Sequence, residues 1–287
     1  MIACERRVLY TGTLVTVRDS LCAEPRSGLG REKSASEHML EFTRRGVYLT
    51  HRGVAGRETV AAEPAHVLLF NRDAPFRVSH PTDHGDATTT LVFLDEVVRD
   101  AALRHDRGTW RDGAALFTMS HVLAAPEMLI RLHTLRRRLR VGVACAAEAE
   151  ETALDILDAV VDAAARARGA RPNAQRPTTR RARRELVEAV KTRLAAAPAA
   201  DVSLATLARE VATSPFHLAR TFRAETGLPV HQFLLRLRTT IALARLGDPS
   251  LPLSVLAQEL GFASHAHLTT AFRRVFGVAP SQVRRTA

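Results

Sequence analysis

The stretch PLSVLAQELGFASHAHLTTAFRRVFGVAPSQVR, from Pro252 to Arg284, has the pattern of two short helices joined by a tight turn. Its apolar residues recur at helical spacing and are interrupted once, at residues 261–264. Gly261 suits a left-handed helix end, and Ser264 is placed to cap the following helix. Phe262 is predicted to fill the angle between the helices. The apolar residues are Leu253, Leu256, Leu260, Leu268, Phe272 and Phe276.

The second of these helices is predicted to present small and polar residues on its outer face. Arginines on such a face can bridge DNA phosphates or read guanine in the major groove, and a methyl group can touch thymine. The alternative is a helical hairpin with a solvated face, because helix-turn-helix shapes also occur as simple packing units. The outward residues are His265, Ala266, His267, Thr269, Thr270, Arg273 and Arg274.

The same pattern occurs once more, about fifty residues earlier. The segment that starts at Leu204 superimposes on the opening stretch in its core, cap and stop positions. Pro215 stands at the first position of its second helix, where a missing N–H costs little. The chain is therefore predicted to carry two helix-turn-helix units. The repeat makes the alternative, packed helical hairpins without a DNA-binding role, less favoured. The outward residues of the first unit are Phe216, His217, Ala219, Arg220 and Arg223.

Between the two units, residues 230–246 are predicted to form one helix about 25 Å long. A rigid helix of this length would separate the recognition helices of the two helix-turn-helix units, so that both could enter successive major-groove turns about 34 Å apart.

Positive charge is confined to the C-terminal part of the chain. Residues 171–287 hold 18 Lys and Arg against 7 Asp and Glu, whereas residues 1–170 hold 23 of each. A neutral part joined to a basic part indicates that the basic part meets a polyanion. DNA is favoured over a membrane surface because the arginines are interleaved with helix-core positions. With no apolar run of membrane-spanning length and no signal-like start, a cytoplasmic protein is expected.

The first 120 residues read as short strands rich in β-branched and aromatic residues, which predicts a small β-sandwich or barrel. Such barrels can hold a small ligand in the mouth, but many are simply packed. The predicted strands are Val8–Val17, Gly46–His51, His66–Asn71, Phe76–His80 and Thr88–Leu94.

Helical periodicity follows from about Asp95, with helices predicted over 127–141 and 147–169. The second has a narrow apolar seam that suits either packing on the sheets or pairing with a second subunit. Residues 171–184 lack apolar periodicity and are predicted to be a linker, whose arginines add phosphate contacts if they lie beside DNA. The seam residues are Leu154, Leu157, Val161 and Ala164.

The three cysteines, Cys4, Cys22 and Cys145, have no metal-type spacing and are expected to be reduced thiols. No pair of histidines in the β region has the spacing of a metal site, so neither a metal nor another cofactor is expected. Cys22 with His38 or His80 is the least implausible metal combination. An enzyme would need a nucleophile and base, or a metal cluster, and the sequence suggests neither.

Residues 185–286 resemble the DNA-binding domain of the AraC/XylS family of transcriptional regulators. The resemblance implies an N-terminal cupin-like β domain and helices used for dimerisation. Three core or turn residues differ from the family pattern, namely Ala212, Leu268 and Val283, and Thr270 stands where some members place a base-reading arginine. The matching positions are 204–222, Thr226, Gly227, Arg238, Ala242, Leu246, Leu256, Ala257, Gly261, Phe262, Ser264, Phe272, Gly277, Pro280, Gln282 and Arg284.

These observations predict an α+β protein, with a cupin-like β-sandwich or barrel and flanking helices first and an all-α double helix-turn-helix domain last. The predicted parts are a sensor domain (1–120), a helical dimerisation or packing region (121–170), a linker (171–184) and the DNA-binding domain (185–287). The DNA-binding residues are expected to be Phe216, His217, Arg220, Arg223, His265, His267, Thr270, Arg273 and Arg274.

The expected function is transcriptional regulation through promoter DNA, controlled by a small-molecule effector in the first domain. The expected partners are double-stranded promoter DNA, that effector, a second copy of the chain and, for an activator, RNA polymerase, without a membrane. The alternative trigger is a redox or metal response through Cys22 and the nearby histidines.

Overall fold

The computed structural model describes residues 4–53, 58–105, 115–169 and 177–286. The chain forms two compact units, the first extending to Arg171 and the second covering Pro172–Arg285. The first contains all the described strands and the second is helical, so the predicted α+β class is confirmed. No helix among the described residues is long and apolar enough to cross a membrane.

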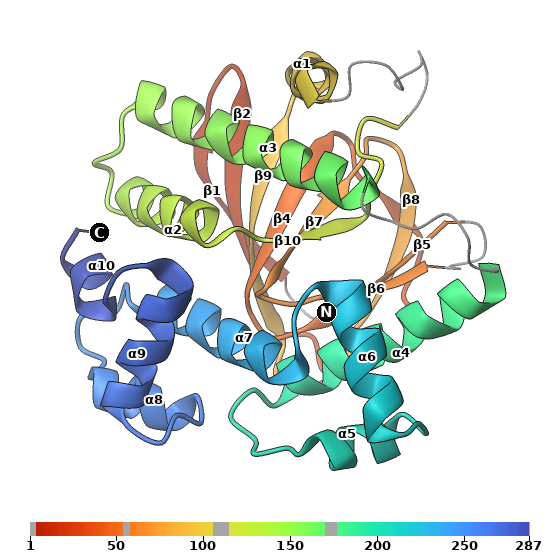
Figure 1. The fold of residues 1–287 in the computed structure, drawn as a ribbon. Helices are drawn as coiled ribbons and strands as arrows, with labels where there is room; N and C mark the ends of the chain where they lie inside the picture. Colours follow the sequence, from red (N-terminus) through yellow and green to blue (C-terminus); the bar gives the residue numbers. More distant parts are fainter. Residues whose placement is uncertain (1–3, 54–57, 106–114, 170–176, 287) are drawn as a thin grey trace. The chain divides into compact units, whose positions relative to one another are not determined.

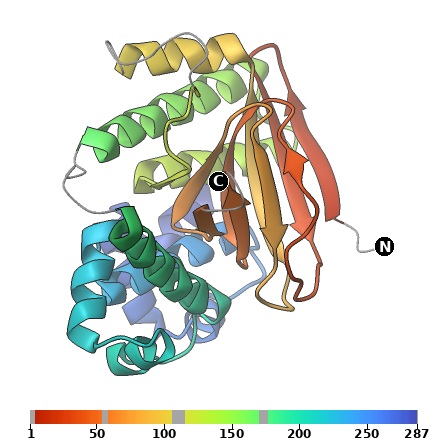
Figure 2. The ribbon, with the colours of Figure 1, turned by 90° about the vertical axis from the view of Figure 1, so that its right-hand side faces the viewer.

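The N-terminal unit contains two antiparallel sheets that face each other (Figure 1, Figure 2). The larger sheet has six strands in the order β1-β2-β9-β4-β7-β10, and the smaller has four in the order β3-β8-β5-β6. This arrangement agrees with the predicted sandwich or barrel. The strands are β1 (Cys4–Thr11), β2 (Val15–Cys22), β3 (Lys33–Ser34), β4 (His38–Arg45), β5 (Tyr48–Arg52), β6 (Glu58–Ala62), β7 (His66–Phe70), β8 (Pro75–Ser79), β9 (Asp86–Phe93) and β10 (His121–Leu123).

One predicted strand is wrong, because Val8–Val17 forms a hairpin and not a single strand. Strand β1 ends at Thr11 and β2 begins at Val15, and the Gly12 N–H donates to the Val15 carbonyl at 3.0 Å. The β-branched run on both sides of the turn hid the reversal. The hairpin matters because it places Cys4 directly opposite Cys22.

Helices α1 (Asp95–His105), α2 (Pro126–Arg140) and α3 (Ala146–Gly169) cover one face of the six-stranded sheet (Figure 2). Most sheet residues on that face are apolar and buried, and the buried polar ones include Asp19, Thr89 and His38. Asp19 is buried there and accepts hydrogen bonds from Arg136 of α2 and from Thr89, at 2.9 and 2.8 Å. Burial alone would raise the pKa of Asp19, but Arg136 and Arg44 hold it below its ordinary value.

The seam of α3 packs largely within this unit. Leu157, Val161 and Ala164 are buried, whereas Leu154 is half-buried. Helix α3 contacts α2, α1 and β10. These contacts account for most of the apolar seam without a second subunit.

The C-terminal unit consists of seven described helices. The first, α4, already begins at Pro177, so the linker prediction is wrong for residues 177–184. Prolines were read as breakers there, yet Pro177 stands at the first helical position, where proline is tolerated. The helices are α4 (Pro177–Ala196), α5 (Leu204–Glu210), α6 (Pro215–Thr226), α7 (Val230–Arg245), α8 (Leu253–Glu259), α9 (His265–Phe276) and α10 (Pro280–Thr286).

The helices form a repeat, in which α4-α5-α6 corresponds to α7-α8-α9. Ser214 and Ser264 cap α6 and α9 by accepting from the backbone N–H groups of His217 and His267, at 3.2 and 3.1 Å. The repeat includes an ion pair that joins α4 to α5 in the first helix-turn-helix unit and α7 to α8 in the second. These pairs are Arg193–Glu210 at 3.1 Å and Arg245–Glu259 at 2.5 Å.

The turns of the two units have the same backbone conformation but different residues. Ala212 has a φ of 51° and its counterpart Gly261, 49 positions later, has a φ of 72°. A Cβ at Gly261 would lie 2.4 Å from the carbonyl oxygen of Ala199. Alanine in this region is strained by about 1–2 kcal/mol even without such a clash.

Exchanging the two turn residues should therefore have opposite effects on stability. We expect Ala212→Gly to stabilise the C-terminal unit by about 0.5–1 kcal/mol, since relief of strain exceeds the entropy cost of glycine. We expect Gly261→Ala to destabilise it by more than about 2 kcal/mol, because strain and the contact with Ala199 add. Urea unfolding followed by circular dichroism measures both, and equal shifts in the same direction would contradict this account.

Candidate nucleic-acid interface

The second helices of the two units, α6 and α9, carry all of the predicted DNA-binding residues. Their inner faces are buried through Leu218 and Phe222 in α6 and through Leu268 and Phe272 in α9. Their outer faces are exposed, and Phe216 is 78% exposed at the start of α6. The structure exposes all nine predicted residues, Phe216, His217, Arg220, Arg223, His265, His267, Thr270, Arg273 and Arg274.

The histidines on these faces are partly held by their own helices. The His217 Nε2 lies 3.3 Å from the Thr221 hydroxyl, and the His265 Nε2 lies 3.4 Å from the Thr269 hydroxyl. His267 packs edge-on against buried Phe262, with ring centroids 5.3 Å apart. His267 therefore supports the turn as well as facing outward, and Phe262 fills the angle between α8 and α9 as predicted.

The arginines on α6 and α9 are free to meet an anion. Within the described part of the chain, Arg220, Arg223, Arg273 and Arg274 have no carboxylate at ion-pair distance, whereas Arg193 is paired. Two exposed helices with unpaired guanidinium groups match the chemistry of phosphate and guanine recognition.

A buried arginine on α7 connects the two helix-turn-helix units of the C-terminal unit. Arg238 donates from Nε to the Pro198 carbonyl at 2.6 Å and from Nη2 to the Ala200 carbonyl at 3.2 Å, both before α5. Its Nη1 donates to the Gly261 carbonyl at 2.8 Å, in the turn of the second unit. Sequence reasoning used Arg238 only as a family position. Its distance of 40 residues from Pro198 left no local signal for this role.

Comparisons with known proteins agree with this geometry. A family profile described as a helix-turn-helix domain matches residues 207–286. A putative AraC-like transcription regulator of Streptomyces antibioticus is 34% identical over 88 residues, which are 31% of this chain and 29% of that protein. The multiple antibiotic resistance protein MarA of Escherichia coli is 32% identical over 85 residues, 30% of this chain and 67% of MarA. The chain belongs to the AraC/XylS family.

Solved structures also match this AraC-type chain. An apo variant of ToxT from Vibrio cholerae aligns over 96% of this chain and 98% of its own, with 12% identity and a TM-score of 0.41. The DNA-binding domain of AdpA, in complex with a target DNA, aligns over 34% of this chain and 89% of its own, with 26% identity and a TM-score of 0.33. The chain spans less than a third of the length of the Streptomyces relative.

The departures from the AraC pattern have visible structural roles. Ala212 adopts the left-handed conformation at the turn where the family often has glycine. Leu268 and Val283 are both buried, which agrees with their interpretation as core substitutions. Thr270 is exposed on α9, so the second helix offers a hydroxyl at this point and not a guanidinium group.

The cysteines of the N-terminal unit differ from the prediction. Cys4 and Cys22 form a disulfide, with Cα atoms 4.2 Å apart, so the expectation of three reduced thiols is wrong in this structure. The spacing argument failed because the β1–β2 hairpin was not recognised, and only that hairpin brings the two residues together. Cys145 is free and exposed.

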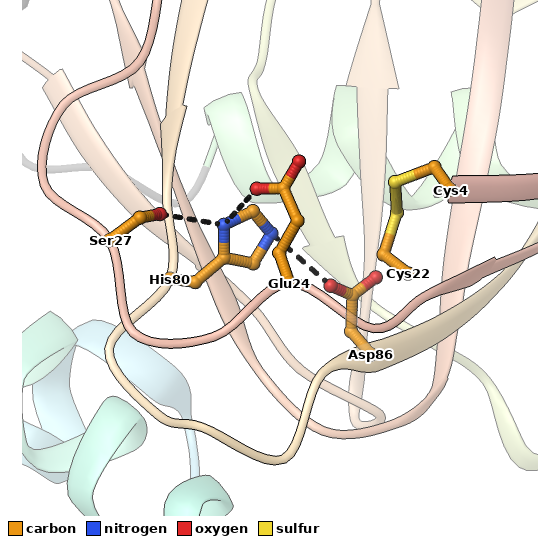
Figure 3. Close-up of a disulfide and its surroundings, with 6 residues drawn as sticks. All are labelled: Cys4, Cys22, Glu24, Ser27, His80 and Asp86. Carbon is orange, nitrogen blue, oxygen red and sulfur yellow. Dashed lines mark hydrogen bonds and ion pairs between the residues drawn. A yellow bond between two sulfur atoms is a disulfide. The ribbon is translucent and has the colours of Figure 1, made fainter. Parts of the chain in front are cut away.

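The weak metal candidates are not brought together. The sulfur of Cys22 is bonded to Cys4, and His80 lies between Glu24 and Asp86 (Figure 3). His38 instead lies 3.6 Å from Asp95 and accepts from the Arg72 N–H at 3.3 Å. The described residues contain no group of three His, Cys, Asp or Glu side chains that could hold a metal ion. A metal response through Cys22, His38 and His80 therefore has no support in this geometry.

Sequence reasoning missed a half-buried carboxylate between the two sheets. Glu41 on β4 accepts a hydrogen bond from the Thr90 hydroxyl at 3.4 Å. Burial, followed by the nearby charge of Asp86, raises the pKa of Glu41 to about 7. The alternation of β4 could have revealed Glu41 as an inward-facing charge, but this strand was not predicted.

Glu41 should make the stability of the protein depend on pH. Its pKa is about 7 in the folded state against an ordinary value of 4.5, so the folded state binds this proton more tightly. Its contribution to stability is present below about pH 4.5 and is lost as the pH rises through 7. We expect Glu41→Gln to stabilise the N-terminal unit by about 1–3 kcal/mol at pH 8, and by much less at pH 5. Thermal unfolding at both pH values measures this, and an equal effect at both would contradict it.

Proposed function

We propose that this protein is a DNA-binding transcriptional regulator whose two helix-turn-helix units insert α6 and α9 into the major groove of promoter DNA. The observation that carries the proposal is the pair of exposed helices, α6 and α9, whose arginines have no ion-pair partner among the described residues. Buried Arg238 connects the two helix-turn-helix units that contain these helices. Membership of the AraC/XylS family supports the same conclusion.

Within this proposal, α6 reads bases and α9 mainly clamps the DNA. Helix α6 offers Arg220 and Arg223 beside the exposed ring of Phe216. Helix α9 offers Thr270 at its centre and places Arg273 and Arg274 in its last turn, where they suit phosphate contacts. The net charge of +11 supports a large electrostatic share of the affinity.

The salt dependence of promoter binding tests this proposal. If the four arginines meet phosphates or bases, the logarithm of the binding constant should fall steeply with the logarithm of salt concentration, with a slope of about −0.9 per neutralised phosphate. Fluorescence anisotropy on a promoter duplex and on a scrambled duplex separates specific from non-specific binding. Affinity that is independent of salt would contradict the proposal.

The proposal extends to the whole protein in the same terms. The N-terminal unit binds a small-molecule effector, the regulator acts as a homodimer in the cytoplasm, and an activating form contacts RNA polymerase without being an enzyme. The resemblance to AraC/XylS regulators supports the dimer and the effector. A hollow of about 140 Å³ between the two sheets, lined by residues of both, supports an effector site independently.

The Cys4–Cys22 disulfide favours a second candidate trigger, a redox response. Disulfides in intracellular proteins are usually transient or redox-sensing, so a regulator that carries one could be switched by its reduction. Promoter output in cells treated with an oxidant tests this, with Cys22→Ser as the variant and Cys145→Ser as the matched control. An oxidant response that persists in Cys22→Ser would remove this candidate.

A further inference from the structure

One end of the six-stranded sheet carries a cluster of arginines on the face that the helices cover. The strand register sets Arg7 of β1 opposite Asp19 of β2, and Asp19 opposite Thr89 of β9, so these side chains share that face. The Nη2 of Arg136 on α2 lies 2.8 Å from the Oδ2 of Asp19, and the Nη2 of Arg44 on β4 lies 3.7 Å from it. We call this cluster the arginine patch, and its members are Arg7, Arg44, Arg45, Arg136 and Arg140.

A shift of register in β4 places Arg45 in the patch, and its charge neighbours place Arg140 there. The register between β4 and β9 shifts just before Arg45, which then lies opposite Ala87. Ala87 stands two residues before Thr89 on β9, so Arg45 belongs to the same face. Burial lowers the pKa of Arg44 to about 10, and the nearby charges of Arg140 and Arg45 act in the same direction. Five guanidinium groups therefore gather at one end of the sheet.

The patch contains more positive charge than its carboxylates neutralise. Among the described residues, Asp19 is the only carboxylate at ion-pair distance from any member, and it faces Arg136 and Arg44. The three other arginines are exposed. Within the six-stranded sheet, Glu5 is the only other carboxylate on this face, two residues before Arg7 on β1. The Nε of Arg44 is buried and donates to no acceptor in the part of the chain that the structure describes.

The patch does not follow from a generally basic composition. Residues 1–170 hold 23 basic and 23 acidic residues. Part of the acidic set gathers in a groove between α1 and α3 that is also lined by Leu14. Leu14 precedes Asp19 by five residues along the chain, which corresponds to about 16 Å of strand. The unit is therefore polarised, with a basic and an acidic region. The acidic residues of the groove are Glu96, Asp100, Asp155, Asp158 and Asp162.

The dipole of α2 explains only one exposed member of the patch. Cations in the last turn of a helix are stabilised by its negative end, and Arg140 is the last residue of α2. Arg7 and Arg45 come from strands, so this effect does not apply to them. Like charges held close together repel one another, and a bound anion offsets that repulsion.

The shape of the patch suits a row of phosphate groups. It extends over the adjacent strands β1, β2, β9 and β4, which span about 14 Å at a strand spacing of about 4.8 Å. A DNA strand carries one phosphate charge per about 3.4 Å of helix axis, so a row of this length can meet more than one phosphate. Guanidinium groups match phosphate oxygens in geometry as well as charge.

We propose that the arginine patch of the N-terminal unit binds backbone phosphates of the promoter DNA that flanks the sites of α6 and α9. Arg7, Arg45 and Arg140 donate to phosphate oxygens, and Asp19 holds the guanidinium groups of Arg136 and Arg44 in place. Such contacts add affinity and salt dependence but carry no sequence information. The inference rests on the proposed function, in which the C-terminal unit reads the promoter.

Fluorescence anisotropy of the full chain on a short and a long promoter duplex tests the inference. The short duplex ends at the two major-groove turns that α6 and α9 occupy, and the long one continues for about one helical turn on each side. We expect the long duplex to bind about fivefold more tightly or more, with a salt slope steeper by about 2, since each neutralised phosphate contributes about −0.9.

Two double variants assign the gain to the patch. Arg45→Ala with Arg140→Ala is expected to lower the ratio of long-duplex to short-duplex affinity to less than about twofold. Arg77→Ala with Arg131→Ala is the matched control, because it removes the same charge from exposed sites outside the patch. There Arg77 pairs with Glu32 at 3.7 Å, and Arg131 pairs with Asp155. Circular dichroism establishes that both double variants are folded.

Equal affinity for the two duplexes would overturn the inference. It would also be overturned by a ratio that the patch variant leaves unchanged, or that both double variants lower alike. The proposed function is tested separately, on the short duplex and a scrambled duplex of the same length. Preference for the short promoter duplex without a gain on extension would overturn only this inference, whereas loss of that preference would overturn only the proposed function.

Discussion

Replacing Arg220 with alanine is expected to weaken binding to specific promoter DNA by about 1–3 kcal/mol, roughly a 5- to 150-fold loss of affinity. Arg220 is exposed on α6, follows a serine-capped helix start, and has no carboxylate partner among the described residues. Its removal therefore costs an intermolecular contact and no intramolecular one. The loss should be larger on the specific duplex than on a scrambled one, because base contacts carry sequence information.

Arg104→Ala is the matched control for Arg220→Ala. It removes the same charge from α1 of the N-terminal unit, where Arg104 pairs with Asp100 at 2.8 Å. We expect this control to change promoter affinity by less than about twofold. If both variants lose affinity equally, net charge and not α6 governs binding, and the assignment of α6 as the reading helix is wrong.

Replacing Arg238 with alanine is expected to destabilise the C-terminal unit by about 3–5 kcal/mol. The side chain is largely buried and satisfies the carbonyl groups of Pro198, Ala200 and Gly261, which would all lose their donor. The two helix-turn-helix units would also lose the side chain that connects them. Hydrogen exchange measured by mass spectrometry on peptides of residues 197–203 and 260–264 should show faster exchange in both segments.

Two variants serve as controls for Arg238→Ala. Arg245→Ala, on the same helix, removes a surface pair with Glu259 and is expected to cost less than about 1 kcal/mol. Arg238→Lys keeps the charge but cannot serve three carbonyl groups in the planar geometry of a guanidinium, so it should recover little. Faster exchange in only one of the two segments would show that Arg238 does not connect the two helix-turn-helix units.

The C-terminal unit was predictable from sequence because its signals are local. Helical spacing, the serine caps at Ser214 and Ser264 and the glycine ends at Gly227 and Gly277 all act within a few residues. Each of these local patterns also occurs twice in the sequence, once in each helix-turn-helix unit. The exposed residues of α6 and α9 followed from the same periodicity.

The N-terminal unit was predictable only in class, because its decisive features depend on strand pairing. The disulfide follows from the β1–β2 register, and the hollow between the sheets is lined by residues from strands that lie far apart in the sequence. None of these residues is close to its partner in the sequence. Arg238 was missed for the same reason, since its carbonyl partners lie 40, 38 and 23 residues away.

The most direct test of the central claim is guanine-N7 methylation protection on a promoter duplex bound by the full-length protein, because this atom lies in the major groove. The duplex should be chosen from genomic sites mapped by chromatin immunoprecipitation. Two reading helices predict two clusters of protected guanines about one helical turn apart on one face of the DNA. A single cluster that Arg220→Ala leaves unchanged, or the absence of any protected guanine, would contradict the account.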